Sequence, residues 1–380
     1  MTAWLIERGT ALLDGALRKA PVALADGLVA EGVPEGARRF DAEGLLVLPG
    51  LVDVHGDAHE RQMQPRPGIG FPHALGMRDS AAQLLAAGIT TACLGVTLSW
   101  EPGLRGIAAW RATLAAVEAL RGQGGCDLRI HCRHEADNLE VMEELLADIA
   151  AGRVALLAFN DHTPGIVKRL PDAAKAAAYA QRGGVKVAEF AALAEAAMAR
   201  RPEVPAAQAR LAEAARAAGI PMLSHDDATP EARAAFRALG AKVCEFPMSE
   251  AVAQAAREAG EHVVMGAPNV VRGGSHMGWG SAAPMAEQGL VTILASDYYW
   301  PAMLEAAFVM VGRGVLDLPA AWALVSTNPA DAAGLEDRGR IAPGLRGDVV
   351  VVDAARRAPV ATFCEGELAW LAAEAAGRVG

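Results

Sequence analysis

A histidine and an aspartate stand one residue apart, His55 and Asp57, in the segment LPGLVDVHGDAHERQMQPRPG that spans residues 48–68. In a buried strand the side chains alternate between two faces, so residues i and i+2 point the same way. An imidazole and a carboxylate that converge on one point can bind a divalent metal ion, or they can form an ordinary hydrogen bond. The pair by itself leaves both interpretations open.

The elements that would position this pair are visible as eight short apolar runs between residues 48 and 336, separated by stretches with helical patterning such as 101–124, 188–218 and 300–313. The runs read LVDVH, TTACLGV, LRIHC, VALLAFN, PMLSH, KVCEF, HVVMGA and VTILASD. Eight parallel strands with crossover helices are typical of a (β/α)8 TIM barrel, and an open doubly wound sheet is the alternative. We therefore expect an α/β protein built on such a barrel.

The two ends of the chain differ from the middle. Residues 1–47 read as short strands with turns, and residues 337–380 return to this style around a run of four valines. This pattern predicts a small β-sandwich domain formed by both termini, with the barrel spanning residues 48–336.

Polar residues follow most of the predicted strands, which is where a barrel places its active site. Five of the nine histidines lie at these ends, namely His55, His131, His134, His162 and His225. Five carboxylates lie there too, at Asp57, Glu135, Asp161, Asp226 and Asp297. So many carboxylates around one pocket need compensating positive charge, which one or two divalent ions of zinc, manganese or iron would supply. The alternative is a set of separate salt bridges to Arg133, Arg66 or Arg272.

Composition limits the class of protein. At 380 residues with 52% hydrophobic residues the chain can bury a large core, and we expect a soluble, cytoplasmic protein without a membrane span or secretion signal. The five scattered cysteines favour reduced thiols over a disulfide framework. A formal charge of −10 makes nucleic acid an improbable partner, and the sequence leaves a homo-oligomer open.

Several blocks together resemble one family. LPGLVDVHGD, SDYY and the closing segment at residues 328–353 look like the amidohydrolase superfamily, whose members place a mononuclear or binuclear metal centre in a (β/α)8 barrel. HGD followed by PRPG, then NDHTPG, SHDDAT, EFP, MGAPNVVRGGSHMG and SDYY, resemble the phosphonate-metabolism branch, the α-D-ribose 1-methylphosphonate 5-triphosphate diphosphatases. The resemblance implies a metal-dependent hydrolase that cleaves this triphosphate to the 5-phosphate and diphosphate.

The resemblance also implies roles for individual residues. His55, Asp57 and Asp297 would hold one metal ion, while His162 and His225 hold the second. Glu135 is the candidate bridging carboxylate, with Lys186 as the alternative, and Asp297 is the candidate general base. The candidate substrate-binding residues are Arg66, Asp226, Arg272, Ser275 and His276.

The sequence departs from that branch beside the pocket, at Ala58, His59 and Trp300. An amidohydrolase acting on an amide, a cyclic amide or a nucleobase is therefore the alternative function, with the same metals and a different substrate loop. A barrel that stores metal or binds a ligand without turnover is a further alternative. His59 could be an additional ligand.

Overall fold

The eight predicted runs form one parallel sheet in the computed structural model, which describes residues 2–273 and 282–380. The strand order is β15-β14-β13-β12-β11-β10-β9-β8, so each strand lies beside its neighbour in sequence. The bounds are β8 Leu51–Gly56, β9 Ile89–Leu98, β10 Asp127–Glu135, β11 Leu156–Asn160, β12 Met222–His225, β13 Val243–Glu245, β14 His262–Gly266 and β15 Ile293–Ala295. The predicted barrel is confirmed, and the open doubly wound sheet is not what the chain forms.

The barrel closes at its C-terminal end between β15 and β8. Asp297 donates its amide N–H to the carbonyl oxygen of His55 at 2.9 Å, and Asp57 donates to the carbonyl oxygen of Asp297 at 2.8 Å. The register of β8 against β9 shifts between Asp53 and Gly56, so simple alternation does not run through this part of the strand. Two candidate site residues therefore lie on the seam that closes the sheet.

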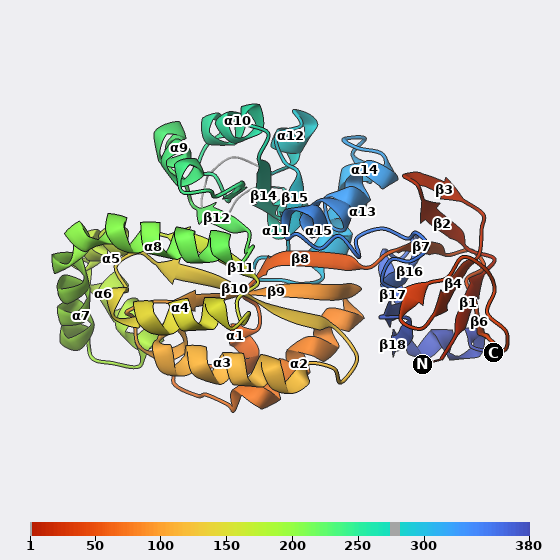
Figure 1. Ribbon diagram of the computed structural model, residues 1–380, viewed down its shortest axis with the longest axis horizontal. Helices are drawn as coiled ribbons and strands as arrows, with labels where there is room; N and C mark the ends of the chain where they lie inside the picture. The colour runs from red at the N-terminus through yellow and green to blue at the C-terminus, as the bar shows by residue number, and fades with distance from the viewer. Residues whose placement is uncertain (1, 274–281) are drawn as a thin grey trace.

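Helices cover the outside of the barrel (Figure 1). The predicted helical stretch 188–218 is interrupted by a short 3-10 turn at Arg201–Glu203, which contains Pro202 and precedes Pro205 in the first turn of the next helix. The α-helices are α1 Glu60–Met63, α2 His73–Ala86, α3 Ile107–Leu120, α4 Met142–Ala150, α5 Thr163–Arg169, α6 Ala173–Gly183, α7 Val187–Ala199, α8 Val204–Ala217, α9 Pro230–Ala238, α10 Glu250–Glu258, α11 Ala267–Arg272, α12 Ala282–Glu287, α13 Ala302–Gly312, α14 Leu318–Ala323 and α15 Thr327–Ala332. The 3-10 helices are η1 Gly103–Arg105, η2 Leu139–Val141, η3 Arg201–Glu203 and η4 Ala373–Arg378.

Both termini build two further sheets, as the sequence predicts. One sheet has the order β5-β4-β1-β6 and the other β18-β17-β16-β7-β2-β3, and a separate apolar core that includes Trp4, Phe40 and Phe363 belongs to this domain. The bounds are β1 Trp4–Glu7, β2 Thr10–Leu13, β3 Ala16–Arg18, β4 Val22–Ala25, β5 Leu28–Val29, β6 Arg38–Asp41, β7 Leu46–Pro49, β16 Val349–Asp353, β17 Ala358–Cys364 and β18 Glu367–Leu371. The division at residues 47/48 and 336/337 stays a prediction.

The valine run explains how the two parts pack. Val349 and Val351 belong to the core of the β-domain, whereas Val350 and Val352 belong to the core of the barrel and its helices. A strand buried on both faces is apolar at every position, which is why this run does not alternate. Figure 1 shows the β-domain, with both chain ends, at one end of the molecule.

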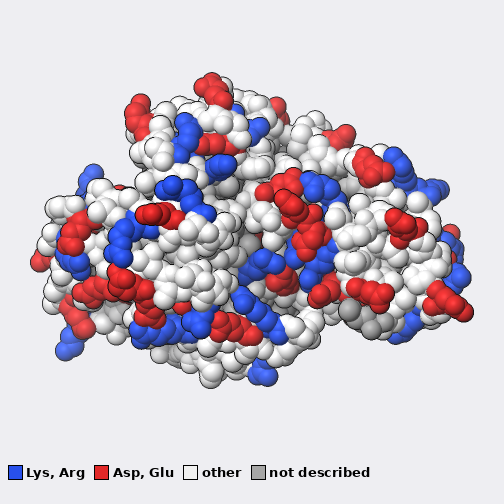
Figure 2. Space-filling view, viewed as in Figure 1, with Lys and Arg blue, Asp and Glu red and all other residues white. Residues whose placement is uncertain are grey.

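The surface is mixed in charge. Acidic and basic side chains are interspersed over the face in Figure 2. Among the described residues, no helix has the length and apolar character that crossing a bilayer would require.

Candidate metal centre

Glu245, at the end of β13, joins two histidines that are far apart in sequence. Its Oε1 accepts from Nδ1 of His55 at 2.7 Å, and its Oε2 accepts from Nδ1 of His225 at 2.8 Å. The two imidazoles stack with centroids 5.5 Å apart and an angle of 8°, and the ring of Phe246 stands edge-on to both. The three polar side chains are buried and their candidate ligand atoms lie within 4.8 Å of one another.

These contacts fix the charge of the carboxylate. Burial alone would raise the pKa of Glu245, but the neighbouring His55 and His131 and the hydrogen bonds from His225 and His55 hold it well below its usual value. Burial lowers the pKa of His225 despite its acidic neighbours, so its imidazole favours the neutral form. Glu245 is therefore an ionised carboxylate that accepts a hydrogen bond from Nδ1–H of a neutral His225. The Nε2 atom of His225 keeps its lone pair.

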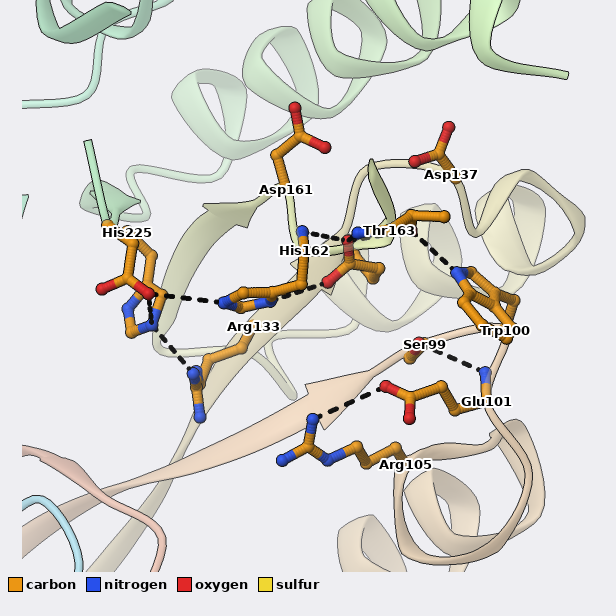
Figure 3. Close-up of polar contacts among 12 residues, drawn as sticks. Ser99, Trp100, Glu101, Arg105, Arg133, Asp137, Asp161, His162, Thr163 and His225 are labelled. Carbon is orange, nitrogen blue, oxygen red and sulfur yellow. Dashed lines mark hydrogen bonds and ion pairs between the residues drawn. The ribbon is translucent and has the colours of Figure 1, made fainter. Parts of the chain in front are cut away.

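A second cluster shares His225 with the first. Asp226 Oδ2 lies 3.6 Å from Nε2 of His162 and 3.6 Å from Nε2 of His225, and these three residues form a group whose ligand atoms lie within 4.8 Å. Figure 3 shows the rings of His162 and His225 near each other, with Arg133 below them. Burial opposes protonation of His162, but its bonds to Asp226 and Glu135 raise its pKa to about 9. Two adjacent groups that share one histidine are an arrangement suited to one or two divalent cations.

Glu135, at the end of β10, is occupied by the β11–α5 turn. Its Oε1 accepts from the amide of His162 at 2.6 Å and from the amide and hydroxyl of Thr163 at 3.1 Å each. Its Oε2 accepts from Nδ1 of His162 at 3.0 Å. Burial alone would raise the pKa of Glu135, but these contacts lower it to about 2. In this arrangement Glu135 orients His162, and its predicted role as a bridging ligand stays a prediction.

Arg133 brings positive charge to the middle of the centre. Its Nη2 donates to Nε2 of His225 at 3.0 Å (Figure 3), and its Nη1 lies 3.6 Å from Oδ2 of Asp57. A Cβ at Gly95 would make ordinary contacts, 3.4 Å from Cδ of Arg133 and 3.6 Å from Nε2 of His55, so these two side chains approach the same point on β9. His55, Asp57 and His225 therefore face one space despite the irregular register of β8.

The backbone after three barrel strands is strained. Asp226, Phe246 and Asp297 have φ of 58°, 53° and 56°, in the left-handed region that residues with a Cβ seldom adopt. Asp226 and Phe246 follow β12 and β13 directly, and Asp297 is the second residue after β15. Such conformations persist where the surrounding structure fixes them, and they cluster at functional sites. Asp297 also lies close to Gly266, where a Cβ would be 3.1 Å from its Oδ2.

The two histidines of β10 point to opposite sides. His131 donates from Nδ1 to the carbonyl oxygen of Val54 at 2.9 Å and lies 5.3 Å from the ring of His55, whereas His134 bonds to the carbonyl oxygen of Asn138. The Nε2 of His131 is buried and makes no hydrogen bond within the described part of the chain. An orphaned imidazole nitrogen beside the first cluster fits a site that takes a cation.

A third acidic group has a different explanation. Glu135, Asp137 and Asp161 lie within 4.8 Å of one another, but Arg201 contacts Asp137 at 2.8 Å and forms a two-point pair with Asp161. Asp161 is therefore held by an arginine. His59, the possible additional metal ligand, forms a hydrogen bond through Nδ1 to the carbonyl oxygen of Gly56.

The predicted substrate-binding residues are dispersed. Asp226 lies in the centre, Arg66 is exposed in the loop after α1, and Arg272 is exposed at the end of α11 with Nη1 3.1 Å from Oη of Tyr298. Lys186, the alternative bridge, is exposed at the start of α7 rather than at a strand end. Ser275 and His276 lie outside the described residues.

The sequence alone did not predict that Glu245 and Arg133 lie in the middle of the metal centre. Both lie in runs that the pattern identified, KVCEF and the segment after LRIHC, and both follow the same strand-end rule as the histidines. Glu245 is 190 residues from His55, so only the closed barrel shows that they touch.

The comparisons with known proteins agree with this fold. The model of a family described as "Amidohydrolase family" matches residues 72–365, and this chain belongs to the amidohydrolase superfamily. Within it, the chain is 35% identical over 323 residues to the alpha-D-ribose 1-methylphosphonate 5-triphosphate diphosphatase of Escherichia coli (strain K12), covering 82% of this chain and 84% of that enzyme. It therefore belongs to the phosphonate branch that its motifs resemble.

Solved structures support the fold alone, because their sequence identities are low. A molinate hydrolase structure aligns with a TM-score of 0.66 at 16% identity, covering 97% of this chain and 94% of that chain. An N-acetylglucosamine-6-phosphate deacetylase from Pasteurella multocida aligns with a TM-score of 0.64 at 11% identity, covering 96% and 99%.

Proposed function

We propose that this hydrolase cleaves α-D-ribose 1-methylphosphonate 5-triphosphate to the 5-phosphate and diphosphate, an acid-anhydride hydrolysis in phosphonate catabolism. The observation that carries a hydrolase is the pair of ligand clusters sharing His225 at the C-terminal mouth of the barrel. The choice of substrate is supported by the similarity to the E. coli enzyme over most of both chains. A cytoplasmic location and a possible homo-oligomer stay predictions.

We propose His55, Asp57 and Asp297 as ligands of one metal ion and His162 and His225 as ligands of the second. Glu135 stays the proposed bridging carboxylate. Glu245 accepts a hydrogen bond from one histidine of each set, so we propose that it orients both for metal binding. Zinc, manganese or iron bound there would act as a Lewis acid and lower the pKa of a coordinated water toward neutrality.

The residues of the chain would supply the remaining steps. Asp297, on the seam that joins β15 to β8, is the proposed proton acceptor for the attacking water. Arg133 faces the same space, and its guanidinium is suited to donate to phosphoryl oxygens as charge develops on them.

The alternative is hydrolysis of an amide, a cyclic amide or a nucleobase at the same centre. One observation favours it: a segment of 119 residues is 35% identical to an allantoinase from Rubrobacter xylanophilus, covering 30% of this chain and 24% of that protein. The match to the diphosphatase covers far more of both chains, so the diphosphatase stands first.

An assay of diphosphate release tests the proposal. Purified chain supplied with zinc, manganese or iron is expected to release diphosphate from the ribose triphosphate and to leave a panel of amides and cyclic amides intact. The Asp297→Asn variant should lose at least roughly a hundredfold in kcat because the proton acceptor is gone. The surface variant Glu143→Gln is the matched control, because Glu143 is exposed and its ion pair among the described residues is with Arg210. Turnover of amides alone would overturn the proposal.

A further inference from the structure

A cavity of about 310 Å³ lies beside the metal centre and contains none of the residues placed there so far. It lies between α1, the η1 loop and α6. Its lining consists of three arginines, four apolar residues, one carboxylate and two amides: Arg61, Arg105, Arg182, Pro67, Pro102, Leu104, Ala178, Glu60, Gln64 and Gln181. Arginine fits wherever an anionic oxygen is bound, and the apolar side chains favour a group without charge.

The arginines are held in place before any ligand arrives. The carboxylate of Glu101, which is only 3% exposed, contacts Arg182 and lies 3.5 Å from Nη1 of Arg105. Figure 3 shows Arg105 and Glu101 facing each other. Arg61, Arg105 and Arg182 all line the cavity, so donors of their guanidinium groups are the ones that a ligand oxygen there would meet.

The loop and the helix are packed closely together at Gly103. Its φ is +80°, and a Cβ there would stand 3.1 Å from the carbonyl oxygen of Arg182. Only glycine suits both the conformation and the close approach. The η1 loop with Arg105 and the helix α6 with Arg182 are therefore held at a fixed spacing.

Two hydrogen bonds connect residues that line the cavity to the backbone of the centre. Arg61 donates from Nη2 to the carbonyl oxygen of Tyr298 at 2.8 Å, one residue after Asp297. The amide of Glu60, another lining residue, donates to the carbonyl oxygen of Asp57 at 3.0 Å. A substrate whose reacting phosphate lies at the metal ligands could therefore extend its other end into the cavity.

The charges select one end of the proposed substrate. Three guanidiniums against the carboxylates of Glu60 and Glu101 leave one net positive charge among the lining and supporting residues. A diphosphate carries several negative charges and no apolar group, whereas a methylphosphonate ester carries one charge and a methyl group. We propose, on the basis of the proposed function, that this cavity binds the methylphosphonate group at C1 of the ribose.

Ligand binding to the metal-loaded protein tests this assignment. Isothermal titration would compare ribose 1-methylphosphonate 5-phosphate with ribose 5-phosphate, which lacks the methylphosphonate. The wild type is expected to bind the first roughly tenfold or more tightly, because hydrogen bonds to charged groups are the stronger kind. In Arg182→Met that preference should fall about tenfold, and in Arg182→Lys, which keeps the charge, it should fall less.

Controls separate the possible outcomes. Arg210→Met changes an exposed arginine whose ion pair within the described part of the chain is with Glu143, and it should keep the full preference. If Arg182→Met misfolds, Arg61→Met gives the same test from another wall of the cavity. Wild-type protein that releases diphosphate but shows no preference would overturn the cavity assignment alone. A preference that Arg182 variants retain would also overturn it, while a wild type that shows the preference without diphosphate release would overturn the proposed reaction instead.

Discussion

Glu245 illustrates how burial and pairing determine what a residue can do. A carboxylate that is 0% exposed would be costly to ionise by itself. Glu245, however, accepts hydrogen bonds from Nδ1–H of His55 and His225, and Nδ1 of His131 lies 3.8 Å away. This leaves the Nε2 atoms of His55 and His225 pointing away from it, toward Gly95 and Arg133. Histidine ligands of metal ions are commonly oriented by a carboxylate in this way.

Glu245→Gln is therefore expected to weaken metal binding. The amide oxygen can accept a hydrogen bond from one imidazole only. The NH2 group would donate to Nδ1 of the other imidazole, which then carries its proton on Nε2 and cannot bind the metal through that nitrogen. Metal content after dialysis, measured by plasma emission spectrometry, should show an affinity lower by about 10- to 100-fold. Glu143→Gln provides the comparison, and an unchanged metal affinity in Glu245→Gln would contradict the orienting role.

At the scale of elements, the sequence predicts where the strands lie better than it predicts which way their side chains point. All eight barrel strands coincide with apolar runs, because strands buried on both faces are apolar throughout. The shifted register of β8 is invisible to periodicity, since it depends on the contacts of Asp53 with Ser296, far away in the sequence. The opposite directions of His131 and His134, in contrast, follow from alternation along β10.

The helices are anchored by buried charge, as Arg233 on α9 shows. It is 0% exposed and pairs with Glu261, which also pairs with Arg237 at 2.6 Å. Glu261→Gln should lower the free energy of unfolding by about 3 kcal/mol, because the buried guanidinium of Arg233 loses its nearer carboxylate partner and keeps the more distant Asp227 at 3.6 Å. Chemical denaturation at neutral pH measures this loss, and Glu143→Gln should leave the unfolding midpoint unchanged.

The same pair predicts a dependence on pH. Burial alone would raise the pKa of Glu261, but its bonds to Arg237 and Arg233 lower it below the ordinary 4.5. A depressed pKa gives stability that is fully present above the unfolded value and is lost as the pH falls through the folded value. The stability gap between wild type and Glu261→Gln should therefore be constant from pH 7 to pH 5 and narrow below 4.5. A gap that widened on acidification would contradict the pairing.

At the scale of the whole molecule, the barrel carries the chemistry and the β-domain packs at the other end of its strands. β7 ends at Pro49 and β8 begins at Leu51, so the β-domain joins where the barrel strands start. The residues of the centre and of the arginine-lined cavity lie between His55 and Tyr298. The two ends could be assigned to one domain from sequence style, whereas the assembly of the cavity from α1, η1 and α6 required the folded chain.

Removal of the metal is expected to show how much the metal centre adds to the thermal stability of the whole protein. Imidazoles and carboxylates from β8, β11, β12 and β15 are the proposed ligands, so bound ions would tie together strands from both halves of the barrel. A ligand present at 100 times its Kd stabilises the native state by ~2.7 kcal/mol. Dialysis against a chelator is expected to lower the melting temperature by several degrees, and added zinc, manganese or iron should restore it. The Glu245→Gln variant should show a smaller shift, and a wild-type melting curve indifferent to both treatments would contradict a metal centre at this position.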